Sequence, residues 1–314
     1  MLNFYKTEGG QVVQKDRLVP GCWVNVVEPT PQEIEYLTGE LGLDQDFVRS
    51  SLDEEESSRI EAEDNDQVLV IVDLPVADRQ EEDKTILYST APMGIILTGD
   101  YVVTISVRPQ QVVEEMADGR VKNVTTHLRT RFLLSLLFRI ATRYLVYLKQ
   151  IDKISSYTEQ QLHKSMRNKE LIQLLGLEKS LVYFSTSLKS NEITLEKILR
   201  GRIIKLYEDD QDLLEDVLVE VKQAIEMCNI YTSILSGTMD AFASVISNNL
   251  NIVMKILASI TIVMSIPTIV SSFYGMNISG GGMPLDQFWW FPVALSAALC
   301  VAAVVILVKK DMFH

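Results

Sequence analysis

The sequence predicts an α+β cytoplasmic domain, with helices around a mixed sheet, followed by a long stalk helix and two C-terminal transmembrane helices. Three observations favour this fold class: β-branched clusters precede residue 110, helix-favouring sequence follows from about residue 112, and two apolar stretches end the chain. These stretches, at about 252–274 and 288–308, are long enough to cross a hydrocarbon core of roughly 30 Å as helices. We therefore expect a cytoplasmic α/β domain at 1–125, a cytoplasmic helical bundle and stalk at 126–250, and a transmembrane domain at 251–314.

The charged residues lie mostly before the apolar stretches. The chain has 29 basic and 42 acidic side chains, and those that follow residue 250 are Lys255, Asp286, Lys309, Lys310 and Asp311. The preceding part is therefore strongly acidic, which argues against a nucleic-acid partner and favours cations, although acidity also serves solubility alone. The N-terminus has no charged region followed by an apolar one, so we expect no signal peptide and a cytoplasmic location for most of the chain.

Strands and short helices are expected to alternate in the first third of the chain. Thr30, Pro31 and Glu33 form a capping-box start for one helix, and residues 44–63 are expected to form a second, strongly acidic helix. Runs of β-branched residues separated by turn formers predict the strands of the mixed sheet. These runs lie at 11–14, 22–27, 68–72, 85–88, 93–97 and 101–105.

Known catalytic and metal-binding patterns are missing from the sequence. It contains no Gly-rich phosphate loop, no GxSxG and no HExxH pattern, so we expect no enzyme. Cys22, Cys228 and Cys300 are far apart and form no Cys/His pattern. We therefore expect reduced thiols and no structural zinc.

A helical bundle is expected after residue 112. Residues 132–148 are apolar, but Arg139 and Arg143 interrupt them, and each such charge at bilayer depth costs roughly 2.5–3.5 kcal/mol. We therefore expect an amphipathic bundle helix there instead of a span. Helices at 169–190 and 193–199 extend the bundle up to a break at Gly201.

One very long helix is expected at 209–274. This segment contains no proline before Pro267 and no glycine except Gly237. A continuous helix of this length measures roughly 100 Å. Two helices, broken near Gly237 or near residues 248–249, are the alternative.

The second apolar stretch gives the membrane orientation. An aromatic belt, Phe288-Trp289-Trp290-Phe291, marks its entry, and Lys309-Lys310 follows its exit. By the positive-inside rule the Lys end is cytoplasmic, whereas residues 275–287 contain no Lys or Arg and are expected outside. The sequence thus predicts a multi-pass protein of the inner (cytoplasmic) membrane with both termini in the cytoplasm.

Small and polar residues recur at steps of three and four along the long helix. Coiled coils keep such positions apolar, whereas polar groups at membrane depth usually face a bundle interior or a water-filled cavity. This seam therefore predicts a pore lining; close packing of helices through small residues is the alternative. The seam consists of Gly237, Asp240, Ser244, Ser247, Asn251, Met254, Ala258, Thr261, Ser265, Thr268 and Ser272.

The long helix leads into a first span ending in Tyr274-Gly275-Met276-Asn277, and an outside loop containing Met283-Pro284 follows. An aromatic-led second span and the terminal Lys309-Lys310 complete the order of elements. Together they resemble the CorA family of magnesium channels. The position of the Gly-Met-Asn triplet at the outer end of the penultimate span makes the match specific, and the order covers the whole chain.

The resemblance implies a homopentameric funnel in the lipid bilayer, with the first spans around one axial pore. Gly275, Met276 and Asn277 would form the selectivity filter, where neutral oxygens bind a hydrated Mg²⁺. Because Mg²⁺ dehydrates reluctantly and prefers oxygen ligands, this role is physically reasonable. Asn277 is alternatively a helix-ending residue, or the acceptor of a glycosylation sequon at 277–279.

The resemblance also implies a gate and a regulatory site on the long helix. It places a hydrophobic constriction at Met254 and Leu257, with Asn251 as a polar ring beneath; Leu257 lies one position off the seam, so packing between neighbours is its alternative. Asp240 would be a cation station. Regulatory Mg²⁺ would bind between cytoplasmic domains at Asp216, whose partner is among Glu114, Glu115 and Asp118; solvated surface acids are the alternative for all of them.

Two points leave the cargo open. The resemblance leads us to expect an acid directly after Met283-Pro284, but this chain has Leu285 there, then Asp286, after three glycines at 280–282. Zn²⁺, Co²⁺ or Ni²⁺ is an alternative cargo for the same architecture. A two-span membrane-anchored sensor is the alternative from another class.

Overall fold

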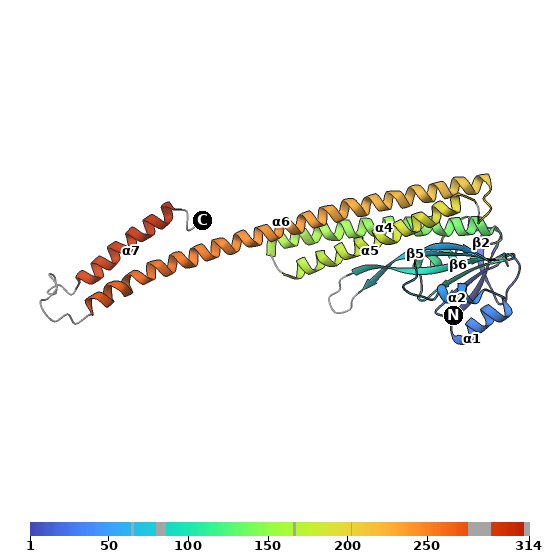
Figure 1. The fold of residues 1–314 in the computed structure, drawn as a ribbon, viewed down its shortest axis with the longest axis horizontal. Helices are drawn as coiled ribbons and strands as arrows, with labels where there is room; N and C mark the ends of the chain where they lie inside the picture. The colour runs from blue at the N-terminus through green and yellow to red at the C-terminus, as the bar shows by residue number, and fades with distance from the viewer. Residues whose placement is uncertain (64–65, 80–85, 166–167, 202, 276–289, 311–314) are drawn as a thin grey trace. The chain divides into compact units, whose positions relative to one another are not determined.

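The computed structural model describes residues 1–63, 66–79, 86–165, 168–201, 203–275 and 290–310 (Figure 1). The chain forms two compact units, Met1–Gly237 and Thr238–His314, and each is described by itself. The division into three domains that the sequence suggests stays a prediction.

The first unit contains a seven-stranded mixed sheet with the order β2-β1-β3-β7-β6-β5-β4. Strands β3 and β7 run parallel, and the other neighbours pair antiparallel. The predicted mixed sheet is therefore confirmed. The strands are β1 Leu2–Glu8, β2 Gln11–Lys15, β3 Trp23–Val27, β4 Arg59–Ala62, β5 Val68–Arg79, β6 Ile86–Leu97 and β7 Val102–Ser106.

Helices cover both faces of this sheet. One face carries α1 Pro31–Glu35, the π-helical turn η1 Tyr36–Glu40 and α2 Gln45–Ser50. The other carries α3 Gln111–Ala117, α4 Arg129–Ser165, α5 Asn168–Leu199 and the first part of α6 Glu208–Tyr274. The predicted capping box is confirmed: the Glu33 backbone N–H donates to the Thr30 hydroxyl, and the Thr30 N–H donates to the Glu33 carboxylate over 2.8 Å.

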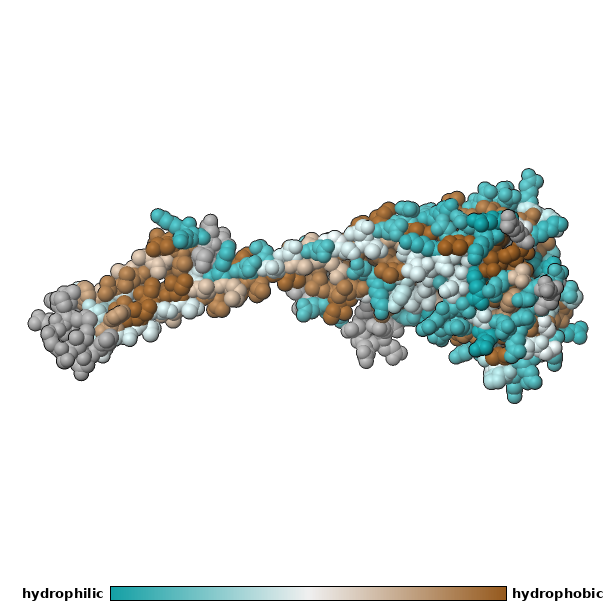
Figure 2. Space-filling model, in the orientation of Figure 1, coloured by the Kyte–Doolittle hydropathy of each residue, from teal (hydrophilic) through white to brown (hydrophobic). Residues whose placement is uncertain are grey.

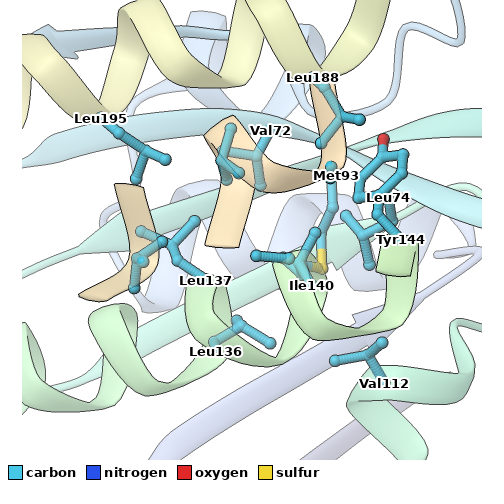
Figure 3. Packing of buried hydrophobic residues seen from close by; sticks show 14 of the residues in the cluster. Val72, Leu74, Met93, Val112, Leu136, Leu137, Ile140, Tyr144, Leu188 and Leu195 are labelled. Atoms are coloured by element: carbon cyan, nitrogen blue, oxygen red, sulfur yellow. The ribbon is translucent and has the colours of Figure 1, made fainter. Parts of the chain in front are cut away.

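The main core lies between the sheet and the long helices. Residues of β5 alternate between the two faces, since Val70 and Val72 pack toward α4 and α5 while Leu69 and Ile71 pack toward α2. Figure 3 shows the packing around Val72, Leu74, Met93, Val112, Leu136, Leu137, Ile140, Tyr144, Leu188 and Leu195. Residues 132–148 thus belong to a bundle helix, as predicted.

The acidic helix expected at 44–63 is wrong beyond Ser50. Helix α2 ends there, and Arg59–Ala62 forms edge strand β4, which pairs antiparallel with β5. Within β4, Ile60 is buried while Glu61 is exposed, which is the period-two pattern of a strand. Arg59, the first residue of β4, forms ion pairs with Glu56 and Glu61. These two acidic residues therefore lie beside the start of the strand and do not belong to a continued helix.

The two strands expected at 85–88 and 93–97 form one strand, β6 Ile86–Leu97; Thr85 lies outside the described residues. Strand β6 pairs with β5 along its whole length, whereas β7 pairs only with Met93–Leu97. Pro92 therefore lies where β6 has a strand neighbour on one side only. A proline is tolerated at such a position because no ladder hydrogen bond is required there.

The two helices expected at 169–190 and 193–199 are likewise one helix, α5. The Asn191 amide donates to the Asp73 carbonyl over 2.9 Å and accepts from the Asp73 N–H over 3.0 Å. The Asn191 side chain therefore links β5 to the interior of α5 and does not cap a new helix. The chain does break at Gly201, which has a φ of 64° and whose N–H donates to the Ile198 carbonyl, as a glycine helix terminus requires.

Asp73 gives the first unit a pH-dependent stability. Burial raises the pKa of its carboxyl, and a hydrogen bond from Ser187 offsets part of the shift. A raised native pKa means that the group stabilises the fold below its unfolded pKa, and that this contribution is lost as the pH rises through the native value. We therefore expect Asp73→Asn to raise the thermal midpoint of the full chain at about pH 7, and less so at about pH 5.

The matched control is Asp16→Asn, because Asp16 is an exposed acid between strands. This control should leave the midpoint nearly unchanged at both pH values. An Asp73→Asn variant that melts below the parent at about pH 7 contradicts the assignment, since loss of a buried charge then has no benefit.

Candidate functional site

The second unit pairs the outer part of α6 with α7 Phe291–Lys309. Helix α7 begins with Pro292 in its first turn, a favoured position for proline, and Trp290 precedes it. The rings of Tyr274 and Phe291 lie 6.3 Å apart, and the Cys300 thiol donates to the Val263 carbonyl over 3.6 Å. The expected second span is thus a helix; residues 288–289 lie outside the described part.

Both helices fit a membrane environment. They are the helices, among the described residues, that are long and apolar enough to span, and their most apolar windows are only 6% and 0% buried. Helices in a soluble core would be mostly buried, so the low burial of these windows argues against that interpretation. Figure 2 shows hydrophobic residues over α7 and the outer part of α6, and a mostly hydrophilic surface on the first unit.

Helix α6 is a single helix of 67 residues, so the alternative of two helices is wrong. Between Ile252 and Val270, its less exposed positions recur at steps of three and four and form the face toward α7, whose Cys300 contacts Val263. They are Ile252, Ile256, Ser259, Val263, Ile266 and Val270. Sequence reasoning did not assign this face to a neighbouring helix.

Every seam residue is exposed in the single chain, including Asp240, Ser244, Ser247, Asn251, Met254, Ala258, Thr261, Ser265, Thr268 and Ser272. At about 100° per residue, the seam points about 150° away from the face that α7 covers. Helix α7 therefore leaves the whole seam open, which suits a surface that faces other subunits or water.

Four hydroxyls of the seam donate hydrogen bonds to backbone carbonyls of α6 itself. The Thr261 hydroxyl donates to the Leu257 carbonyl over 2.8 Å, and the Ser265 hydroxyl donates to the Thr261 carbonyl over 2.7 Å. The hydroxyls of Thr268 and Ser244 donate in the same way, each to the carbonyl four residues earlier. Because each hydrogen is used, the oxygen lone pairs remain free to accept hydrogen bonds from water.

The predicted filter is only partly described. Gly275 directly follows the end of α6 at Tyr274, and its N–H donates to the Ser271 carbonyl over 3.0 Å. Met276 and Asn277 lie outside the described residues, as do 280–282, Leu285 and Asp286. The filter assignment therefore stays a prediction.

The predicted constriction residues lie on the open side of α6. Met254 and Leu257 are both 56% exposed, which is high for side chains of their size. Met254 lies within the seam, while Leu257 is displaced from Met254 by about 60° around the helix. A lining role and a packing role both remain open for Leu257.

The predicted regulatory acids differ in their partners. Glu115 forms an ion pair with Arg143, and Asp118 pairs with Arg120 over 2.9 Å, so both carboxylates already have a cation. Asp216 and Glu114 are exposed on α6 and α3. Within the described part of the chain, no group of three or more His, Cys, Asp or Glu side chains is placed to hold a metal ion. A metal at Asp216 would therefore need ligands from another subunit or from water.

These features define a two-span membrane protein in which one long helix carries an exposed seam of mostly small and polar residues, as expected of an ion transporter. A family model described as "CorA-like Mg²⁺ transporter protein" matches residues 21–310. The chain therefore belongs to the CorA family, and the resemblance inferred from the sequence is confirmed.

Individual relatives agree with this assignment. The cobalt/magnesium transport protein CorA of Methanocaldococcus jannaschii is 27% identical over 90% of this chain and 89% of its own length. The protein of the same name from Thermotoga maritima is 29% identical over 57% of this chain and 50% of its own length. The complete structure of the M. jannaschii CorA magnesium transporter aligns with a TM-score of 0.80 at 24% identity, covering 99% of this chain and 96% of that one. The last comparison concerns the fold alone.

Proposed function

We propose that the chain forms a homopentamer in the inner (cytoplasmic) membrane and carries Mg²⁺ inward through an axial pore lined by the seam. Membership of a magnesium-transporter family supports the cargo. The position of the seam, away from α7 and rich in outward hydroxyl oxygens, supports the path. An inside-negative potential contributes roughly 2.3 kcal/mol per charge per 100 mV, hence about twice that for Mg²⁺, so no ATP is required.

The outer entrance of the pore is the triplet Gly275, Met276 and Asn277. Backbone carbonyls and the Asn277 amide oxygen would contact the water shell of Mg²⁺, which holds its waters tightly. Neutral oxygens suffice because the ion stays hydrated and needs no anionic cage.

Below the entrance, the hydroxyl-bearing seam leads to a constriction at Met254, with Leu257 beside it and the Asn251 ring beneath. A ring of thioether and isobutyl groups closes by dewetting with little movement. Asp240 then supplies one carboxylate per subunit as a cation station. By the positive-inside rule, Lys309 marks the cytoplasmic end of α7, so both termini are cytoplasmic.

Intracellular Mg²⁺ would close the channel by binding at Asp216 between neighbouring subunits. Glu114 is the favoured partner, because Glu115 and Asp118 already have Arg partners. The internal Mg²⁺ concentration at which the current is half-inhibited is expected to be about tenfold higher in Asp216→Asn than in the parent. This change corresponds to about 1.4 kcal/mol of lost binding free energy. Patch recordings with Glu215→Gln as the matched control measure this; an unchanged midpoint contradicts the site.

A second cargo is favoured by one observation. The names of both relatives include cobalt beside magnesium. Co²⁺ also forms a hydrated divalent ion, so a filter that reads the water shell would admit it. No corresponding observation favours Zn²⁺, Ni²⁺ or a membrane-anchored sensor.

Ion flux into liposomes containing the full chain tests the proposed function. We expect uptake of Mg²⁺ and Co²⁺ that exceeds uptake of Zn²⁺. Asn277→Ala should reduce this preference by about tenfold, since one amide per subunit is lost at the entrance. If protein-free liposomes take up Mg²⁺ as fast as liposomes that contain the protein, the proposed transport is contradicted. If Asn277→Ala keeps the preference for Mg²⁺ and Co²⁺ over Zn²⁺, the filter assignment is contradicted.

A further inference from the structure

Pro267 interrupts the hydrogen bonding of α6 at membrane depth. Proline has no N–H, so the carbonyl of Val263, four residues earlier, loses its helical donor. Water is not available inside the hydrocarbon core, and an unsatisfied carbonyl there is costly. The continuous helix therefore requires another donor at this point.

The second helix supplies that donor. The Cys300 thiol of α7 lies with its Sγ 3.6 Å from the Val263 carbonyl oxygen. This is the same carbonyl that Pro267 deprives of an amide. Cys300 is thus not an unused thiol, as its isolated place in the sequence suggests, but the replacement donor at a proline break.

The contacts of α7 lie on both sides of the break. Cys300 contacts Val263 on the inner side of Pro267, whereas the Phe291 ring contacts Tyr274 on the outer side, next to Gly275. Helix kinks occur at proline, so a second helix that contacts α6 on both sides of Pro267 limits how far α6 can bend there. Pro267 lies between Ser265 and Thr268 of the seam, so the geometry of α6 at this point affects the direction of the outermost seam residues.

We propose that α7 braces α6 across Pro267 and that Cys300 is a positioning residue for the outer pore entrance. A thiol is a weak donor, so this brace limits bending of α6 without preventing it. The inference rests on the proposed function only for its flux readout, because the hydrogen bond itself is measurable in the purified protein.

A double-mutant cycle tests the brace. Cys300→Ala is expected to raise the half-saturating external Mg²⁺ concentration about threefold with little change in maximal flux, which matches an average hydrogen bond between membrane helices. Cys300→Ser, which retains a donor, should stay near the parent. In a Pro267→Ala background the alanine N–H satisfies Val263, so adding Cys300→Ala should then have no effect.

The same five proteins, namely the parent, Cys300→Ala, Cys300→Ser, Pro267→Ala and the double variant, are compared by thermal unfolding in detergent, which needs no transport. Cys300→Ala should lower the midpoint in the Pro267 parent and leave it unchanged in Pro267→Ala. Equal effects of Cys300→Ala in both backgrounds, or a Cys300→Ser variant as impaired as Cys300→Ala, overturn the brace. Should no protein carry Mg²⁺ while the midpoints show the predicted coupling, the proposed function fails and the brace stands.

Discussion

Ser265→Leu is expected to lower the Mg²⁺ flux of the full chain by about tenfold or more. In the proposed pentamer, this change puts five isobutyl groups in place of hydroxyl oxygens that accept hydrogen bonds from water. A ring of that kind dries the pore, and each ~1.4 kcal/mol added to the barrier reduces the rate tenfold. The measurement is Mg²⁺ uptake into liposomes at matched protein density.

Ser271→Leu is the matched control, since Ser271 is also an exposed serine of the same helix. At about 100° per residue it lies about 120° from Ser265 around the axis, away from the seam and from the α7 face. We expect Ser271→Leu to keep most of the flux. Equal loss in the two variants would indicate that the seam packs helices together and lines no pore.

Met254→Ser is expected to produce the opposite effect, a leak. The constriction is proposed to close by dewetting, and a serine at each of five positions would let water remain. The residual Mg²⁺ current at high internal Mg²⁺, where the parent is closed, should rise about tenfold, equal to ~1.4 kcal/mol removed from the barrier. Single-channel or macroscopic recordings in planar bilayers measure this current.

Val253→Ser is the control for the leak. Val253 is exposed and adjacent in sequence, but it points about 100° away from Met254. It should leave the closed-state current unchanged. A leak of the same size from both variants would assign the effect to a loosened membrane unit, whereas no leak from Met254→Ser would remove Met254 from the gate.

Much of the fold was predictable because its signals are local. The capping box at Thr30, the helix break at Gly201 and the unbroken run of α6 depend on residues within a few positions of each other. The errors arose where a residue or strand that is distant in the sequence determines the local secondary structure. Strand β4 exists because it pairs with β5, and α5 continues past Asn191 because that amide bonds to Asp73.

The candidate site was likewise predictable only where its signals are local in the sequence. The seam was readable from spacing alone, because small and polar residues at membrane depth are informative. The face of α6 that α7 covers, and the contact of Cys300 with Val263, were not readable, because they depend on how a second helix packs. Met276 and Asn277 lie outside the described residues, so their role still rests on the family resemblance.

The direction of the seam hydroxyls has a consequence for the sign of the charge that passes. A hydrated anion turns the hydrogens of its shell inward and presents oxygens, which need donors on the wall. The hydroxyl groups of Thr261 and Ser265 donate their hydrogens to backbone carbonyls, so only their oxygen lone pairs remain available, as acceptors. In the proposed pore, the wall at these depths would therefore favour the hydration shell of a cation over that of chloride without a charged side chain.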